Sequence, residues 1–238
     1  MKVGYMNLLK QTDPEFYDLF TSFAYDEVIN ETAIELDKKT SCLAIIATLL
    51  GSQSIDLYKD LLPDLMSNVT PIEIKEVVYQ AVAYLGIGRV YPFFEATNNV
   101  FKDKGITLPL ENQGTTTPQN RRKKGTDKQV ELFGESYRYM YKSDPQKTVH
   151  IRRWLAANCF GDYYTRNGLN NKQREMITFC YLAAQGTEVQ LKSHIKGNIR
   201  IGNDEKFLIA VASKCMPYIG YPRTLNTLRC IEEVVKQK

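Results

Sequence analysis

The clearest local signal in the chain lies in residues 70–80, which read TPIEIKEVVYQ. Thr70 supplies a hydroxyl group at the N-cap, and Pro71 suits the first helical position because it needs no hydrogen bond to its nitrogen. Glu73 lies three residues after the cap and completes the pattern of a capping box. The stretch therefore predicts a helix that begins at Thr70.

The rest of the chain repeats this helical character, while alternating, strand-like patterns are scarce. Apolar residues recur at helical spacing in residues 15–30, 37–50, 54–67, 70–100, 122–142, 148–165, 172–185, 188–201 and 204–236. The predicted fold class is all-α.

One segment, residues 105–118 (GITLPLENQGTTTP), lacks this periodicity and is rich in Gly, Pro and Thr, as linkers are. The two halves that it separates share a motif, since YLGIGRV at 84–90 matches YIGYPRT at 218–224 with an offset of 134. A fixed offset indicates duplication of one helical unit. We therefore predict a tandem duplicated helical bundle, with a first repeat at 1–110, a linker at 111–120 and a second repeat at 121–238.

Composition excludes several protein classes. The 238 residues are 43% apolar and 24% charged, which is ordinary for a globular protein and excludes a disordered or collagen-like chain. A net charge of +4 is too balanced for a nucleic-acid or membrane-surface role, although it is compatible with a small anionic partner.

The sequence also lacks the usual targeting and ligand motifs. The longest apolar stretch, residues 42–50, is too short to span a membrane, and the first residues do not form a secretory signal, so we expect a cytoplasmic protein. No metal site or disulfide framework is expected, because the cysteines are odd in number and form no Cys-x-x-Cys pair. They are Cys42, Cys159, Cys180, Cys215 and Cys230.

Acid–base chemistry near neutral pH has few candidates, because His150 and His194 are the only histidines. A short turn at 185–187 between two predicted helices brings Glu175 alongside the helix of His194, where a carboxylate fixes the tautomer of an imidazole. The alternative is that His194 is an ordinary core or surface histidine and Glu175 a helix N-terminal charge. At the offset of 134, Asp60 corresponds to His194 and Ser41 corresponds to Glu175, so the first copy lacks this pair.

Trp154, the single tryptophan, is expected in the core.

Several stretches in order resemble the carboxymuconolactone decarboxylase family. In the second half they are NCFGDYYTRNGL at 158–169, Arg174-Glu175, QLKSH at 190–194 and PYIGYPRTLN at 217–226; in the first half they are DPEF at 13–16, FAYDE at 23–27 and EIKEVVYQ at 73–80. The resemblance implies an all-helical fold shared with the alkylhydroperoxidase D proteins, assembled as trimers or hexamers. It also implies an active site on the helix pair that bears Glu and His. For this chain we expect a homo-oligomer, either a trimer of tandem-repeat chains or a dimer.

The resemblance also covers peroxidase members of this superfamily, whose motif is a Glu, then Cys-x-x-Cys, then a His. In register with Glu175 and His194, the cysteine positions are Thr187 and Gln190 here, so the dithiol mechanism lacks both sulfurs. Cys159 is then a candidate one-cysteine centre, with a small buried thiol as the alternative.

Decarboxylase members imply chemistry without metal or cofactor. By resemblance, His194 is the proton donor and Glu175 its orienting partner. Arg166, Arg174 and Arg223 are candidates for binding a substrate carboxylate, because a guanidinium group engages a carboxylate through two hydrogen bonds. Tyr164, with its neighbour Tyr163, is a candidate for lining the pocket.

The first hypothesis is therefore a cofactor-independent decarboxylase that acts on a small carboxylated lactone or enone. An antioxidant peroxidase is the second, disfavoured by the missing cysteine pair. A non-catalytic helical oligomer that binds a small molecule is the third, and a His194 pocket filled by apolar side chains would favour it.

Overall fold

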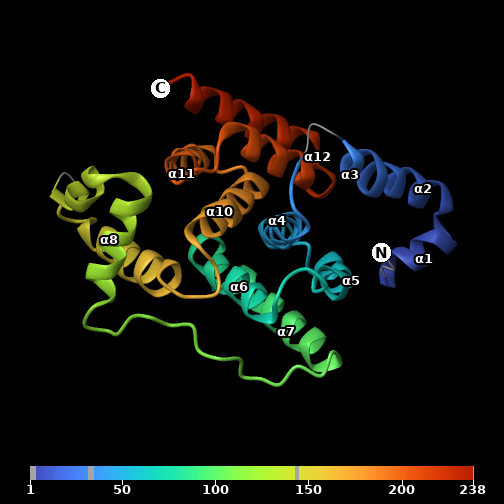
Figure 1. Ribbon diagram of the computed structural model, residues 1–238, viewed down its shortest axis with the longest axis horizontal. Coiled ribbons are helices and arrows are strands. Elements are labelled where there is room, and N and C mark those ends of the chain that lie inside the picture. The colour runs from blue at the N-terminus through green and yellow to red at the C-terminus, as the bar shows by residue number, and fades with distance from the viewer. Residues whose placement is uncertain (1–3, 32–34, 143–144, 238) are drawn as a thin grey trace.

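The structure is a computed structural model that describes residues 4–31, 35–142 and 145–237. Within these ranges every regular element is helical and no strand occurs, which confirms the all-α prediction (Figure 1). The elements in chain order are α1 Gly4–Thr12, α2 Pro14–Ser22, the π-helical η1 Phe23–Glu27, α3 Val28–Asn30, α4 Lys38–Gly51, α5 Ile55–Leu65, α6 Pro71–Leu85, α7 Ile87–Asp103, α8 Arg121–Phe133, the 3₁₀-helical η2 Glu135–Lys142, α9 Val149–Trp154, the π-helical η3 Leu155–Tyr164, α10 Asn171–Gln185, α11 Glu188–Arg200 and α12 Glu205–Val235.

Helix α6 begins as its sequence predicts. The Glu73 backbone N–H donates to Thr70 Oγ1 over 3.2 Å, and the Thr70 backbone N–H donates to Glu73 Oε2 over 2.8 Å, which together make the capping box. The helix ends at Leu85, because Gly86 has a φ of +79°, a backbone conformation that residues other than glycine rarely adopt. The helical spacing seen over 70–100 therefore belongs to two helices, α6 and α7, which meet at this glycine.

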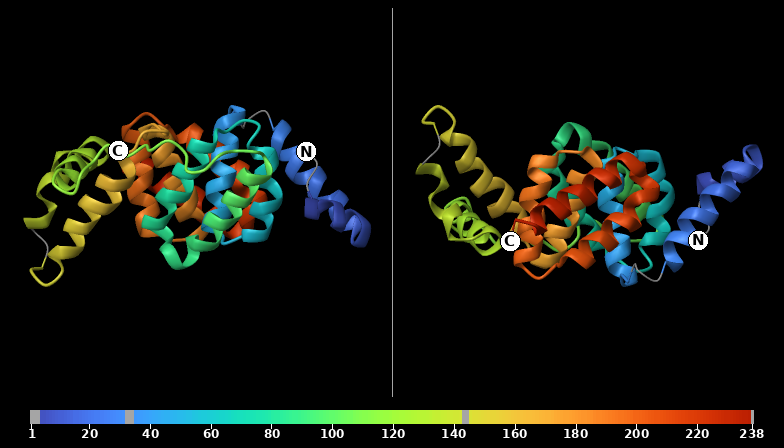
Figure 2. Two further views of the ribbon diagram at one scale, coloured as in Figure 1. Left: turned by 90° about the horizontal axis from the view of Figure 1, so that it is seen from below. Right: turned by 90° about the horizontal axis from the view of Figure 1, so that it is seen from above.

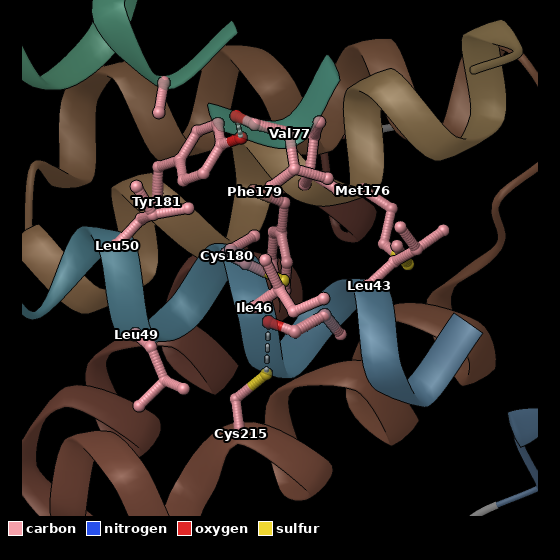
Figure 3. Packing of buried hydrophobic residues seen from close by; sticks show 14 of the residues in the cluster. Leu43, Ile46, Leu49, Leu50, Val77, Met176, Phe179, Cys180, Tyr181 and Cys215 are labelled. Atoms are coloured by element: carbon pink, nitrogen blue, oxygen red, sulfur yellow. Dashed lines mark hydrogen bonds between the residues drawn. The ribbon is translucent and has the colours of Figure 1, made fainter. Parts of the chain in front are cut away.

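The core forms around α4 and α10, which lie side by side in the middle of the bundle (Figure 1). Figure 3 shows side chains of α4 facing those of α10, with Val77 of α6 and Cys215 of α12 closing the cluster. The Tyr181 hydroxyl donates to the Val77 carbonyl oxygen over 2.6 Å. A single buried cluster thus draws residues from both halves of the chain, because each half covers an apolar face of the other.

Two helical arms extend from opposite ends of this core (Figure 2). Helices α1 to α3 form one arm, and α8, η2, α9 and η3 form the other. The long segment from Lys104 to Asn120 joins α7 to α8 across the outside of the bundle. It is anchored to the second arm, because the Asn167 backbone N–H donates to the Gln113 carbonyl oxygen over 2.9 Å.

Helix α8 and η3 pack with their backbones in close contact. A Cβ atom at Gly125 would lie 1.8 Å from the Ala156 carbonyl oxygen, and one at Gly161 would lie 2.2 Å from the Arg121 carbonyl oxygen. Only glycine fits at these two positions. Arg121 at the start of α8 also forms an ion pair with Asp162 of η3.

The helix boundaries of the two halves agree with the offset seen in the sequence. Adding 134 to the bounds of α4, 38–51, gives 172–185, and α10 spans Asn171–Gln185. The same sum converts the 55–65 of α5 into 189–199, within α11, and Gly86 into Gly220, which also has a positive φ inside α12. These matches support duplication, which stays our interpretation of the fold.

Trp154 corrects one expectation. It is 60% exposed and packs edge-on against His150, so it is not a core residue.

Throughout the described ranges, no helix has the length and apolar character needed to cross a membrane.

The buried tyrosines lead us to expect that the folded protein loses stability at alkaline pH. Burial raises the pKa of Tyr58 and Tyr181 above the value of 10 expected in the unfolded chain, so the unfolded chain releases their protons first as pH rises. We expect the free energy of unfolding to fall above pH 10, by about 1.4 kcal/mol per pH unit for each such tyrosine. Urea unfolding between pH 8 and 11, with tyrosinate absorbance, measures this. Titration of all tyrosines near pH 10 in the folded protein would contradict it.

Candidate active site

His194 and Glu175 meet in the structure. Glu175 lies in the N-terminal third of α10 and His194 in the middle of α11, and the short turn at Gly186 and Thr187 folds the second helix back beside the first. The His194 Nδ1 atom lies 2.8 Å from Glu175 Oε2. This pair was expected from the sequence, and its distance is that of a direct hydrogen bond.

The Glu175 carboxylate is fully buried, so its hydrogen bonds matter. Its second oxygen, Oε1, accepts a hydrogen bond from the Tyr164 hydroxyl over 2.8 Å. An ionised carboxylate accepts hydrogen bonds and donates none, so the proton of this pair lies on His194 Nδ1. The arrangement leaves Nε2 as the ring nitrogen available for chemistry.

Two aromatic rings hold the imidazole in place. Tyr84 of α6 and Phe133 of α8 each meet the His194 ring edge to face, with ring centroids 5.4 Å apart in both cases. The Tyr84 hydroxyl lies 3.5 Å from His194 Nε2 and 2.9 Å from the Tyr164 hydroxyl. Tyr84 belongs to the first half of the chain, so both halves contribute to the site.

The tyrosine hydroxyls of this network are neutral. Burial, reinforced by the nearby Glu175 carboxylate, raises the pKa of Tyr84 and of Tyr164 well above 10. The chain of hydrogen bonds continues from Tyr164 to Thr178 Oγ1 over 2.7 Å and from there to the Gln80 amide over 2.9 Å. A connected network of this kind fixes the orientation of each member.

A cavity of about 640 Å³ opens beside His194. This volume is in the range of small-molecule sites. The walls are largely apolar, and polar groups stand near the imidazole and at the rim. The apolar lining residues include Ala83, Phe133, Leu155, Phe160, Leu182 and Val189, and the polar ones include Tyr84, Gln129, Arg152, Thr187, Gln190 and Ser193. The pocket beside His194 is therefore open and not filled by apolar side chains.

The three arginines expected at the substrate lie elsewhere. Arg174 is fully buried, and its guanidinium group binds Glu76 Oε2 over 3.0 Å and Gln80 Oε1 over 2.9 Å. Arg166 binds the same Glu76 carboxylate over 2.9 Å and stacks on Tyr79. These two cations share one buried carboxylate, which explains a cation at the start of α10.

Arg223 lies over Gly186, at the C-terminal end of α10, and lines a different hollow from the one beside His194. Of the candidate residues, the structure therefore brings together His194, Glu175 and Tyr164. Arg166, Arg174 and Arg223 do not line the His194 cavity.

Cys159 of η3 lines this cavity, with its Sγ atom 3.7 Å from the Tyr84 hydroxyl. Burial raises the pKa of the Cys159 thiol to about 12, so the group is protonated at neutral pH. Thr187 and Gln190, the positions of the peroxidase cysteines, also line the wall. Peroxide chemistry needs a thiolate, and this environment does not favour one.

Sequence reasoning missed Tyr84, Phe133 and Arg152 as members of the site. Tyr84 carried a signal, since it opens the motif that recurs at Tyr218. Phe133 and Arg152 carried none, because the packing of α8 and η3 alone brings them to the cavity. Among the described residues, no group of three or more His, Cys, Asp or Glu side chains is arranged to hold a metal ion.

Comparison with known proteins gives two similarities. The model of the carboxymuconolactone decarboxylase family matches residues 150–233, a stretch that contains Tyr164, Glu175 and His194. The chain is also 24% identical over 119 residues to a 4-carboxymuconolactone decarboxylase from Acinetobacter baylyi (strain ATCC 33305 / BD413 / ADP1), an alignment that covers 50% of this chain and 89% of that protein.

Gly197 provides a test of the contact between Glu175 and His194. A Cβ atom at this position would lie 2.7 Å from Glu175 Oε2 and 2.6 Å from Phe133 Cε1. We expect Gly197→Ala to displace the carboxylate from His194 Nδ1 and to shift the imidazole nitrogen resonances in NMR spectra. The matched control is Gly88→Ala, because a Cβ atom there meets nothing within 4 Å. Unchanged imidazole resonances in Gly197→Ala would contradict the close packing.

We expect the Cys159 thiol to react slowly in the native protein. With a pKa of about 12, the thiolate fraction at pH 8 is on the order of 10⁻⁴. All five cysteines are free and buried, so we expect the native protein to react with less than about one equivalent of a thiol-specific disulfide reagent in minutes. Unfolding in guanidinium chloride should expose all five. Rapid native labelling that Cys159→Ser abolishes would show that the thiol is activated.

Proposed function

We propose that this protein is a cofactor-independent, decarboxylase-like enzyme that acts on a small carboxylated lactone or enone, with His194 as the proton donor. The observation that carries the proposal is the 2.8 Å contact between Glu175 Oε2 and His194 Nδ1 beside an open cavity. The match of residues 150–233 to the family model and the similarity to a 4-carboxymuconolactone decarboxylase support the reaction class.

The proposed reaction begins with loss of carbon dioxide. The bond between the substrate carboxylate and its carbon breaks, and its electron pair moves into the conjugated carbonyl group to give a dienolate. The apolar walls, such as Leu155, Phe160 and Leu182, suit this step, because an ionised carboxylate is poorly solvated among them and carbon dioxide is neutral.

Proton return completes the proposed cycle. His194, doubly protonated, donates the proton from Nε2 to the substrate carbon and becomes neutral, and solvent then restores the proton. Glu175 holds the ring through Nδ1 and stabilises its positive charge before the transfer. The neutral Tyr84 hydroxyl, next to Nε2, accepts a hydrogen bond from the protonated ring and orients it before the transfer.

The proposal predicts decarboxylation of 4-carboxymuconolactone by the purified protein, followed as release of carbon dioxide. We expect His194→Asn to lower the rate by about 10²- to 10⁴-fold, the usual contribution of a general acid. Glu175→Gln should also lower the rate, because it removes the charge that supports the protonated ring. Turnover in D₂O should place one deuterium on a carbon of the former dienolate, either the one next to the carbonyl group or the one that loses the carboxylate.

His150→Asn is the matched control, because it removes the other histidine, which does not line the cavity. This variant should keep the rate of the unmodified protein. Equal rates for His194→Asn and His150→Asn would remove His194 from the mechanism. Absence of carbon dioxide release from the lactone and from related carboxylated enones would overturn the proposed reaction class.

A further inference from the structure

A second hollow adjoins the His194 cavity and is lined by arginines. We call it the arginine mouth, and its cations are Arg122 of α8, Arg138 of η2, and Arg152 and Arg153 of α9. The two hollows share the lining residues Gln129, Tyr137, Met140 and Arg152, so one opens beside the other. A ligand that occupies the cavity can therefore reach the arginine mouth with its far end.

Two of the four cations in the arginine mouth have no carboxylate partner among the residues that the structure describes. Arg138 is neutralised by two carboxylates, with Asp127 Oδ1 at 3.0 Å and Glu135 Oε1 at 2.5 Å. Arg122 and Arg153 are exposed, and neither has a carboxylate partner in the part of the chain that the structure describes. Two guanidinium groups at one opening favour an anion with several acceptor atoms.

Gln129 adds an independent observation. Its side chain is only 7% exposed and lines both hollows, at the boundary between them. It shares one face of α8 with Arg122 and Thr126, at spacings of four and three residues. Its amide carries both donor and acceptor atoms. A polar group of a ligand at this boundary can therefore form a hydrogen bond with it.

Between the arginine mouth and His194 the walls are apolar. Phe133, Leu155 and Phe160 line this part of the cavity, so a ligand that spans it has an apolar body. The charged residue in this lining, Arg152, stands on the side of the arginine mouth. The volume of about 640 Å³ accommodates a ligand that reaches from one end to the other.

We infer that the substrate is an anionic amphiphile: an acidic group that is retained in the reaction binds in the arginine mouth, an apolar body lies along the cavity, and the reacting carboxylated group lies at His194. The assignment of the reacting carboxylated group to His194 rests on the proposed function. The binding of an acidic head and an apolar body does not depend on the proposed function, and it can be measured without turnover.

Two dyes separate the contributions of head and body. 1-Anilinonaphthalene-8-sulfonate carries an acidic group on an apolar ring system, and N-phenyl-1-naphthylamine has the same rings without the sulfonate. We expect saturable binding of the sulfonate dye with one site per chain, followed by its fluorescence. Energy transfer from Trp154, which follows Arg153 directly, should accompany it.

The decisive variant is Arg122→Gln/Arg153→Gln. We expect it to raise the Kd of the sulfonate dye at least tenfold, to change that of the neutral dye less than twofold, and to leave the thermal unfolding midpoint unchanged. Lys59→Gln/Lys206→Gln removes the same charge from exposed positions away from the cavity and should change neither Kd. An unchanged Kd for the sulfonate dye, or an equal loss for both dyes, would overturn the inference.

Competition identifies the ligand class. Displacement of the sulfonate dye by 4-phenylbutyrate, but not by 4-phenylbutanol or inorganic phosphate, supports a carboxylate head on an apolar body. Displacement by inorganic phosphate alone, at equal concentration, would overturn the amphiphile and leave a simple anion site. If the dyes bind as expected but no carboxylated substrate releases carbon dioxide, the inference stands and the proposed function fails.

Discussion

A buried carboxylate is the constraint on which the site depends. Glu175 has no exposure to water, so its charge must be balanced by groups that the protein supplies. His194 and Tyr164 each donate a hydrogen bond to one of its oxygens, and these two residues come from α11 and η3. The need to satisfy one carboxylate therefore fixes the relative positions of three elements and, through Tyr84, of a fourth.

The two halves of the chain have unequal parts in this arrangement. The boundaries of α4 and α10, and those of α5 and α11, match at an offset of 134, and the core draws side chains from both halves. The Glu–His pair has no counterpart at this offset, because the first half has Ser41 and Asp60 where the second has Glu175 and His194. The first half still takes part, since Tyr84 forms one wall around the imidazole.

Buried and exposed arginines have different roles in this protein. Arg174 and Arg166 share the Glu76 carboxylate, and this ion-pair cluster joins α6 to α10 and to the segment before it. Removing one partner of such a cluster leaves an unbalanced buried charge, so these residues support the fold. The cations at the opening of the His194 cavity come instead from α8, η2 and α9, in the arm where close packing at Gly125 and Gly161 holds α8 against η3.

The helical class, the start of α6 at its capping box and the candidate pair of Glu175 and His194 were predictable, because each depends on spacing within one helix or across one short turn. The end of the helix at Gly86 was not predicted, because it depends on a positive φ, and neither was the exposure of Trp154. Which arginines face the cavity depends on tertiary packing. A guanidinium group looks the same in sequence whether it meets Glu76 or an open hollow, and the packing of helices distant in the chain makes that choice.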